Sequence, residues 1–187
     1  MKKSVWLLHI SLSKRLAFAA LFAALCCVST VVITVPLPAS GYFNTGDIFV
    51  LLSAWCLGPV YGSLAAAVGS ALGDVILAFP LYAPATFIIK GLDALVAYLV
   101  WALCKKMFKN EKLDFIPRTL SAILGELVMV GGYFLFECVL YGFLGATPNI
   151  IGNVLQGACC AVCAVLLISV LYAIKPIRNL FPPFSKD

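Results

Sequence analysis

Charged side chains are rare in this chain, and one basic residue lies far along the sequence from the other basic residues. Of the 187 residues, 11% are charged and 63% are hydrophobic. Twelve of the 13 basic residues fall into three short segments, which leaves Lys90 alone within an apolar run. A charge inside a bilayer is costly unless it is paired or faces a cavity, so such residues are usually functional. The sequence therefore predicts that Lys90 lies at the centre of the protein's chemistry.

Other polar side chains within or beside the apolar runs are acids, amides and tyrosines. Counting along each expected helix at about 1.5 Å per residue places most of them in the outer half of the membrane, together with Lys90. They offer hydrogen-bond donors and acceptors to a small polar or heteroaromatic solute. The candidate binding residues are Tyr42, Asn44, Asp47, Tyr82, Lys90, Asp93, Tyr133, Glu137, Asn149, Asn153 and Gln156.

Asp74 is expected at the same depth as Lys90, on a neighbouring helix. Because opposite charges attract strongly in a low dielectric, we predict an ion pair between these two residues. Such a pair, with amides that bond between helices, could also be purely structural. Glu126 is the main exception to the outer clustering, since it lies about two turns from Arg118 at the cytoplasmic end. The inner half therefore lacks a polar path, which indicates an outward-facing pocket rather than a pore.

The remaining reactive residues form no catalytic or metal-binding pattern. Cys160 and Cys163 have CxxC spacing, but no second ligand pair or nearby histidine accompanies them. The eight cysteines are therefore expected to be small apolar residues, and His9 a solvated flank residue. An intramembrane enzyme that uses acids is one alternative, but no nucleophile–base pair or H-E-x-x-H motif supports it. A structural membrane subunit is the other. We expect no enzymatic activity, cofactor, metal or nucleic-acid partner.

The composition places the whole chain in a membrane. The mean hydropathy is +1.07, and too few polar residues are present to cover a soluble domain. Basic residues beside spans mark the cytoplasmic face. An even number of spans must therefore separate the three basic segments, which contain Lys2, Lys3, Lys14 and Arg15, then Lys105, Lys106, Lys109, Lys112 and Arg118, and finally Lys175, Arg178 and Lys186.

These rules predict one all-α membrane domain over 1–187 with six transmembrane helices. A single helix over 47–79 would be about 50 Å long, whereas a bilayer core is about 30 Å thick. Gly58 and Pro59 provide a natural break. A single tilted span would instead put Lys105 and Lys106 outside, against the charge bias. The expected spans are 16–35, 47–57, 60–79, 84–103, 120–140 and 148–174, with both termini in the cytoplasm.

Two stripes of small residues are spaced for close helix contact. Gly69 and Gly73 are four residues apart in the third expected span, and internal packing is the favoured interpretation. The second stripe lies on the first span, where internal packing and contact with a partner protein are equally favoured. It contains two overlapping pairs, Ala19 with Ala23 and Ala20 with Ala24.

Short motifs across the chain resemble a known family. The most specific block is YAPATFIIKG at 82–91. The others are GYFNTGD at 41–47, LGPVYG at 57–62, GSALGD at 69–74, PN at 148–149 and NVLQG at 153–157. Together they resemble the substrate-binding S component of energy-coupling factor (ECF) vitamin transporters. The resemblance is to the riboflavin-type branch, which also includes carriers for hydroxymethylpyrimidine and pyridoxine.

The resemblance implies a six-helix subunit of a prokaryotic cell membrane that captures a vitamin outside the cell. Such a subunit docks through an Ala-x-x-x-Ala surface of its first helix on a transmembrane scaffold, the T component, to which two cytoplasmic ATPases bind. No Walker A motif is present, so ATP hydrolysis would come from those partners. We expect a pyridoxine-like or hydroxymethylpyrimidine-like substrate, with riboflavin as the next candidate.

Overall fold

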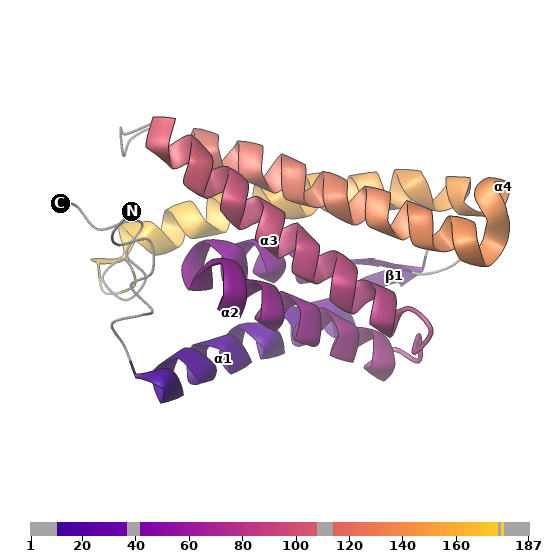
Figure 1. Cartoon of the computed structure of the whole chain (residues 1–187), viewed down its shortest axis with the longest axis horizontal. Coiled ribbons are helices and arrows are strands. Elements are labelled where there is room, and N and C mark those ends of the chain that lie inside the picture. Colours follow the sequence, from indigo (N-terminus) through magenta and orange to yellow (C-terminus); the bar gives the residue numbers. More distant parts are fainter. Residues whose placement is uncertain (1–10, 37–41, 108–113, 176, 178–187) are drawn as a thin grey trace.

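Four long helices contain most of the residues that the structure describes (Figure 1). The computed structural model describes residues 11–36, 42–107, 114–175 and 177. Its elements are α1 (Leu12–Val32), β1 (Thr34–Pro36), β2 (Tyr42–Asn44), α2 (Gly46–Ile76), α3 (Ala83–Met107) and α4 (Phe115–Ala173). Each helix is long and apolar enough to cross a membrane. The prediction of an all-helical membrane protein is confirmed, with one short β-hairpin added. Lys2, Lys3, His9, Gly41, Lys109, Lys112, Arg178 and Lys186 lie outside the described residues.

α2 changes direction at the predicted break. Gly58 has φ 79° and ψ −171°, a conformation that glycine adopts far more readily than other residues, and Pro59 cannot donate a helical hydrogen bond. The hydroxyl of Ser53 donates to the carbonyl oxygen of Gly62 at 3.0 Å. The segments before and after Gly58 therefore pack against each other.

α4 is likewise divided, at Gly142, where φ is 74° and ψ is 167°. The expected spans 120–140 and 148–174 leave a connecting segment between them, but the helix resumes directly after the glycine. The two halves of α4 are connected by side-chain contacts, such as the Asn149 amide donating to Glu137 Oε1 at 2.9 Å. A single positive-φ glycine thus replaces the expected loop.

The glycine stripe packs internally, as predicted. A Cβ atom at Gly69 would lie 2.2 Å from the carbonyl oxygen of Ala23, and one at Gly73 would lie 2.7 Å from Cγ2 of Thr30. Both distances are too short for a side chain, so α1 and the second half of α2 touch through their backbones.

The alanine stripe of α1 divides between two faces. Ala19 and Ala23 are half-buried against the hydrophobic core, whereas Ala20 and Ala24 are exposed. Only the second pair is therefore free to contact a partner on the surface of this chain.

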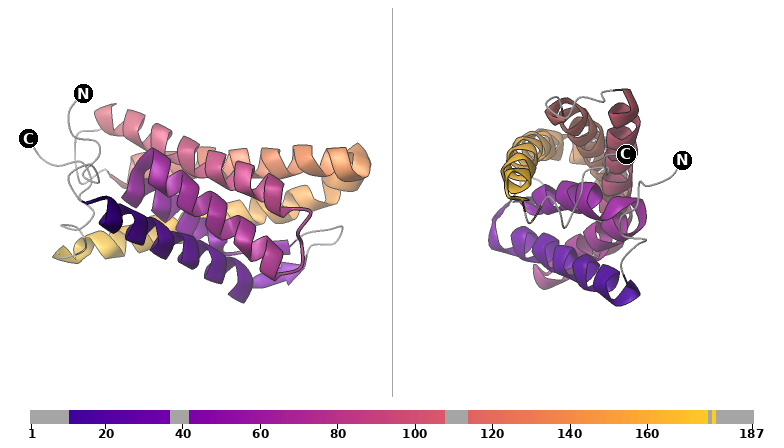
Figure 2. Two further views of the ribbon diagram at one scale, coloured as in Figure 1. Left: turned by 60° about the horizontal axis from the view of Figure 1, so that its bottom comes forward. Right: turned by 90° about the vertical axis from the view of Figure 1, so that its left-hand side faces the viewer.

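The β-hairpin lies at one end of the helix bundle (Figures 1 and 2). The first residues of α1, the end of α3 and both ends of α4 lie at the opposite end. α1 ends at Val32, earlier than the predicted limit of 35, because Val35 precedes Pro36 and such residues disfavour helix. Thr34 pairs instead with Asn44 across the hairpin. This pairing brings β2 over the helix ends.

Candidate functional site

A cavity of about 30 Å³ lies where β2 meets α2, α3 and α4. Its walls consist of hydroxyl, amide and carboxyl groups. The lining residues are Tyr42, Asn44, Asp74, Tyr82, Thr86, Tyr133, Glu137, Asn153 and Gln156. All of them except Asp74 and Thr86 were predicted as binding residues.

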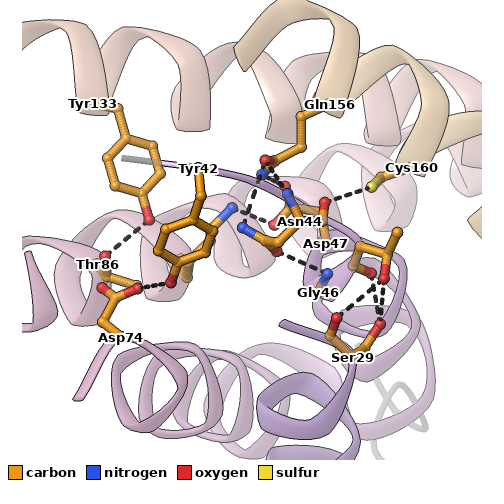
Figure 3. A network of polar contacts seen from close by, with 12 residues as sticks. Ser29, Tyr42, Asn44, Gly46, Asp47, Asp74, Thr86, Tyr133, Gln156 and Cys160 are labelled. Carbon is orange, nitrogen blue, oxygen red and sulfur yellow. Dashed lines mark hydrogen bonds and ion pairs between the residues drawn. The ribbon is translucent and has the colours of Figure 1, made fainter. Parts of the chain in front are cut away.

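Gln156 connects the hairpin to two helices (Figure 3). Its side-chain oxygen accepts a hydrogen bond from the backbone N–H of Asn44 at 2.8 Å. Its Nε2 donates to Asp47 Oδ2 at 2.6 Å. The Asn44 side chain also accepts a bond from the N–H of Gly46 at 2.8 Å, at the first residue of α2. The floor of the cavity is therefore held by one connected polar network.

Lys90 pairs with Asp47, which corrects the predicted pair of Lys90 with Asp74. Lys90 Nζ contacts Asp47 Oδ1 and lies 5.4 Å from the centre of the Tyr133 ring. Asp74 Oδ1 instead accepts a hydrogen bond from the Tyr42 hydroxyl. The reason is the course of α2, whose first half runs inside the bundle and buries Asp47 completely. Depth alone could not distinguish these two aspartates.

On another side of the cavity, tyrosine, threonine and glutamate side chains connect the start of α3, and Tyr82 just before it, to α4. The Tyr82 hydroxyl donates to Glu137 Oε1 at 3.4 Å. Thr86 Oγ1 and the Tyr133 hydroxyl are 2.9 Å apart. Thr86 was missed, although it lies four residues before Lys90 and so shares its helix face.

Four predicted binding residues lie behind the lining rather than on it: Asp47, Lys90, Asp93 and Asn149. All four are buried. Glu126, which was expected near the cytoplasmic end, joins this inner group. Its carboxyl oxygen and those of Asp47 and Asp93 all lie within 4.8 Å of one another. Of the described side chains, these three acids form the group spaced to hold a metal ion.

Three tyrosines, Tyr42, Tyr82 and Tyr133, are among the residues that line the cavity, and two of them pack against phenylalanine rings outside the lining. Tyr42 and Phe79 have ring centres 5.1 Å apart, and Tyr82 and Phe136 have ring centres 5.3 Å apart. Together with the amides and carboxyls, these rings provide stacking surfaces and both kinds of hydrogen-bonding group. The arrangement is suited to binding a small polar ring.

Comparisons with known proteins identify the fold. A solved structure described as "Structure and mechanism of the S component of a bacterial ECF transporter" matches with a TM-score of 0.64 and 22% identity, covering 87% of this chain and 98% of that chain. An uncharacterised protein of Pyrococcus woesei is 38% identical over 130 residues, which are 69% of this chain and 82% of the relative.

A family model identifies the family as well. The model described as "ECF-type riboflavin transporter, S component" matches residues 11–173, which include every described helix. Its members are membrane-embedded transport subunits rather than enzymes, so the alternative of an intramembrane enzyme is not favoured. This chain belongs to the ECF-type riboflavin transporter S-component family.

Proposed function

We propose that this protein captures a small vitamin or vitamin precursor in the cavity beside the β-hairpin and delivers it for ATP-driven uptake. The observation that carries the proposal is the cavity itself. Nine polar or aromatic residues from β2, α2, α3 and α4 converge on it, in a chain whose outer surface is otherwise apolar. Convergent polar groups in an apolar protein are the usual mark of a ligand site.

The substrate that fits this site best is a single substituted ring, such as pyridoxine or hydroxymethylpyrimidine. The cavity volume of about 30 Å³ has room for about two water molecules, so any vitamin must displace side chains or the hairpin on entry. A one-ring ligand needs less displacement than riboflavin with its three fused rings. Riboflavin remains the second candidate because the family model carries its name.

The proposed topology has six spans, with both termini in the cytoplasm. The kinks at Gly58 and Gly142 divide α2 and α4 into two segments each. Basic residues occur at the start of α1, at the end of α3 and just after α4, among them Lys14, Lys105 and Lys175. All of these positions belong to the end of the bundle opposite the hairpin (Figure 1). This charge bias supports a cytoplasmic assignment for that end.

The proposed partners are an ECF transmembrane scaffold, the T component, and two cytoplasmic ATPases. Ala20 and Ala24 are exposed on α1 and are spaced for close approach of another helix. We assign the scaffold contact to this pair rather than to Ala19 and Ala23, which pack toward the core.

A ligand screen tests the function. Purified protein is heated with pyridoxine, hydroxymethylpyrimidine, riboflavin and other B vitamins, and its unfolding temperature is recorded. A ligand at about 100 times its Kd stabilises the folded state by about 2.7 kcal/mol. The shift should vanish in Asn153→Ala, which alters the cavity wall, and persist in Ser169→Ala, on the exposed side of the same helix. If no compound stabilises the folded protein, the proposal is wrong.

A further inference from the structure

Two buried acids behind the cavity have no hydrogen-bond partner. All four carboxyl oxygens of Asp93 and Glu126 lack one among the described residues. Asp93 is 0% exposed and Glu126 is 5% exposed. Burying a carboxylate without a partner is costly, so each side chain needs a compensating group that the protein itself does not provide.

Charges around the two acids do not balance. Asp47 lies within the same 4.8 Å group, but its oxygens are already used by Lys90 and Gln156. Lys90 is the cation in contact with this group. The thiol of Cys160 donates to the carbonyl oxygen of Asn44. If all three acids are ionised, they and the ammonium of Lys90 leave an excess of two negative charges in the interior of a membrane protein.

Glycines on α4 leave room for both unpartnered acids. A Cβ atom at Gly125 would lie 2.5 Å from Asp93 Oδ1, and one at Gly157 would lie 3.1 Å from Glu126 Oε2. Any larger residue at either position would press on a carboxyl oxygen. The space around the two acids is therefore maintained by residues of both halves of α4.

We propose that Asp47, Asp93 and Glu126 bind one hard divalent cation behind the vitamin cavity. Carboxylate oxygens are the preferred ligands of Ca²⁺, Mg²⁺ and Mn²⁺. Oxygens bind Ca²⁺ at about 2.3–2.6 Å, so two ligands on opposite sides of the ion are about 4.6–5.2 Å apart. The three carboxyl oxygens lie within 4.8 Å of one another, which is close enough for one ion to contact all three, and a divalent ion would match the charge of the ionised acids.

The bound cation would influence the vitamin site through Asp47. This carboxylate would share its charge between the ion, Lys90 and Gln156, and Gln156 holds Asn44 at the cavity wall. Ion binding would thereby fix the floor of the cavity. The inference rests on the buried acids alone, so it does not require the vitamin to be identified.

Thermal unfolding without vitamin tests the cation site. The full-length protein in detergent is treated with EDTA and then titrated with CaCl2, MgCl2 or MnCl2, with choline chloride at matched ionic strength as the control. At least one divalent ion should raise the unfolding temperature to a saturating limit. Electron paramagnetic resonance should show saturable binding of Mn²⁺ to the wild-type protein, which requires no variant to fold.

Four variants locate the ion. Asp93→Asn and Glu126→Gln should lose the thermal shift, whereas Asp114→Asn, which removes a carboxylate outside both the cluster and the cavity, should keep it. Gly125→Ala should weaken the shift, because its Cβ would meet Asp93. Gly131→Ala is the matched control, since a Cβ there meets nothing within 4 Å.

Two results would overturn the proposal. One is the absence of both a divalent-specific shift and saturable Mn²⁺ binding, with Asp93→Asn or Glu126→Gln more stable than wild type; the acids would then be neutral and protonated. The other is a shift that survives in both variants, which would place the ion elsewhere. Neither result depends on vitamin binding, so the proposed transport function would stand or fall separately.

Discussion

Lys90 and Arg118 are equally buried, at 2% exposure, but their surroundings differ in kind. Lys90 contacts a carboxylate and lies beside two further acids behind the polar cavity. Arg118 lies among aromatic rings instead. Its guanidinium carbon is 5.2, 5.0 and 4.8 Å from the ring centres of Trp55, Trp101 and Tyr172, respectively.

The difference separates surroundings that could hold a ligand from surroundings that connect helices. Ring faces from α2, α3 and α4 stabilise the Arg118 cation without a ligand, and its Nε donates to Asp114 Oδ2 at 2.7 Å. Arg118 therefore joins three helices. Around Lys90 the acids outnumber the cation, and several polar groups face a cavity, so this region has capacity left for a ligand. Nη1 and Nη2 of Arg118 also lack a hydrogen-bond partner among the described residues, but the guanidinium lies over three rings, whereas Asp93 and Glu126 have no such partner.

The largest predicted effect comes from removing Lys90, the buried cation behind the cavity. Lys90→Met leaves Asp47 as an uncompensated buried charge, which should destabilise the protein by about 3–5 kcal/mol. Adding Asp47→Asn should restore much of that loss, measured by thermal unfolding. Asp74→Asn is the control, because Asp74 contacts Tyr42 rather than Lys90. Additive effects of Lys90→Met and Asp47→Asn would contradict the observed pair.

The second predicted effect concerns the aromatic cage, which consists of the rings of Trp55, Trp101 and Tyr172 around Arg118. Arg118→Lys keeps the charge but loses the flat group that stacks on three rings. Because each cation–π contact contributes about 0.5–2 kcal/mol, we expect a stability loss of about 1–2 kcal/mol. Vitamin affinity, measured on the folded fraction, should stay within about twofold. A loss of affinity with unchanged stability would mean that Arg118 belongs to the binding region.

The burial of Arg118 could not be predicted from the sequence. It was grouped with the cytoplasmic basic residues that flank the spans, but the structure buries it near the start of α4. Its burial depends on Trp55 and Trp101, which come from other helices and have no sequence spacing relative to it. The break at Gly58 follows from local chemistry and was predicted, whereas the continuous helix with a kink at Gly142 was expected as a loop between two helices.

Sequence reasoning predicted which residues line the cavity better than it predicted which residues pair with each other. Amides and tyrosines such as Asn153 and Tyr133 follow from helix periodicity and depth, and both line the cavity. The partner of Lys90 depends on how the first half of α2 enters the bundle, which is a property of tertiary packing. Glu126 was assigned to the wrong region for the same reason, since depth was counted along one helix without the tilt of its neighbours.

A smaller effect concerns the pH dependence of the cage. Burial alone would raise the pKa of Asp114, but the charges of Arg118 and Lys105 outweigh it and hold the pKa below the usual 3.8. A lowered folded-state pKa contributes stability that is present above the unfolded value and is lost as pH falls through the folded value. The stability advantage of wild type over Asp114→Asn should therefore shrink as pH falls below about 4, as measured by thermal unfolding. A constant difference between the two proteins across this range would show that the ion pair contributes nothing.

The smallest effect on the isolated protein is expected at the exposed alanines of α1, far from either buried cation. Ala20→Trp with Ala24→Trp adds bulk at two exposed positions, so thermal stability and vitamin binding should remain nearly unchanged. Ala23→Trp is the contrasting variant, because Gly69 lies against the Ala23 backbone and a large side chain would separate α1 from α2. If the exposed pair contacts the scaffold, the double variant should fail to co-purify with the T component and the ATPases, while wild type does so. Assembly that survives both tryptophans would move the docking surface elsewhere, and a loss of vitamin binding would mean that α1 supports the binding region after all.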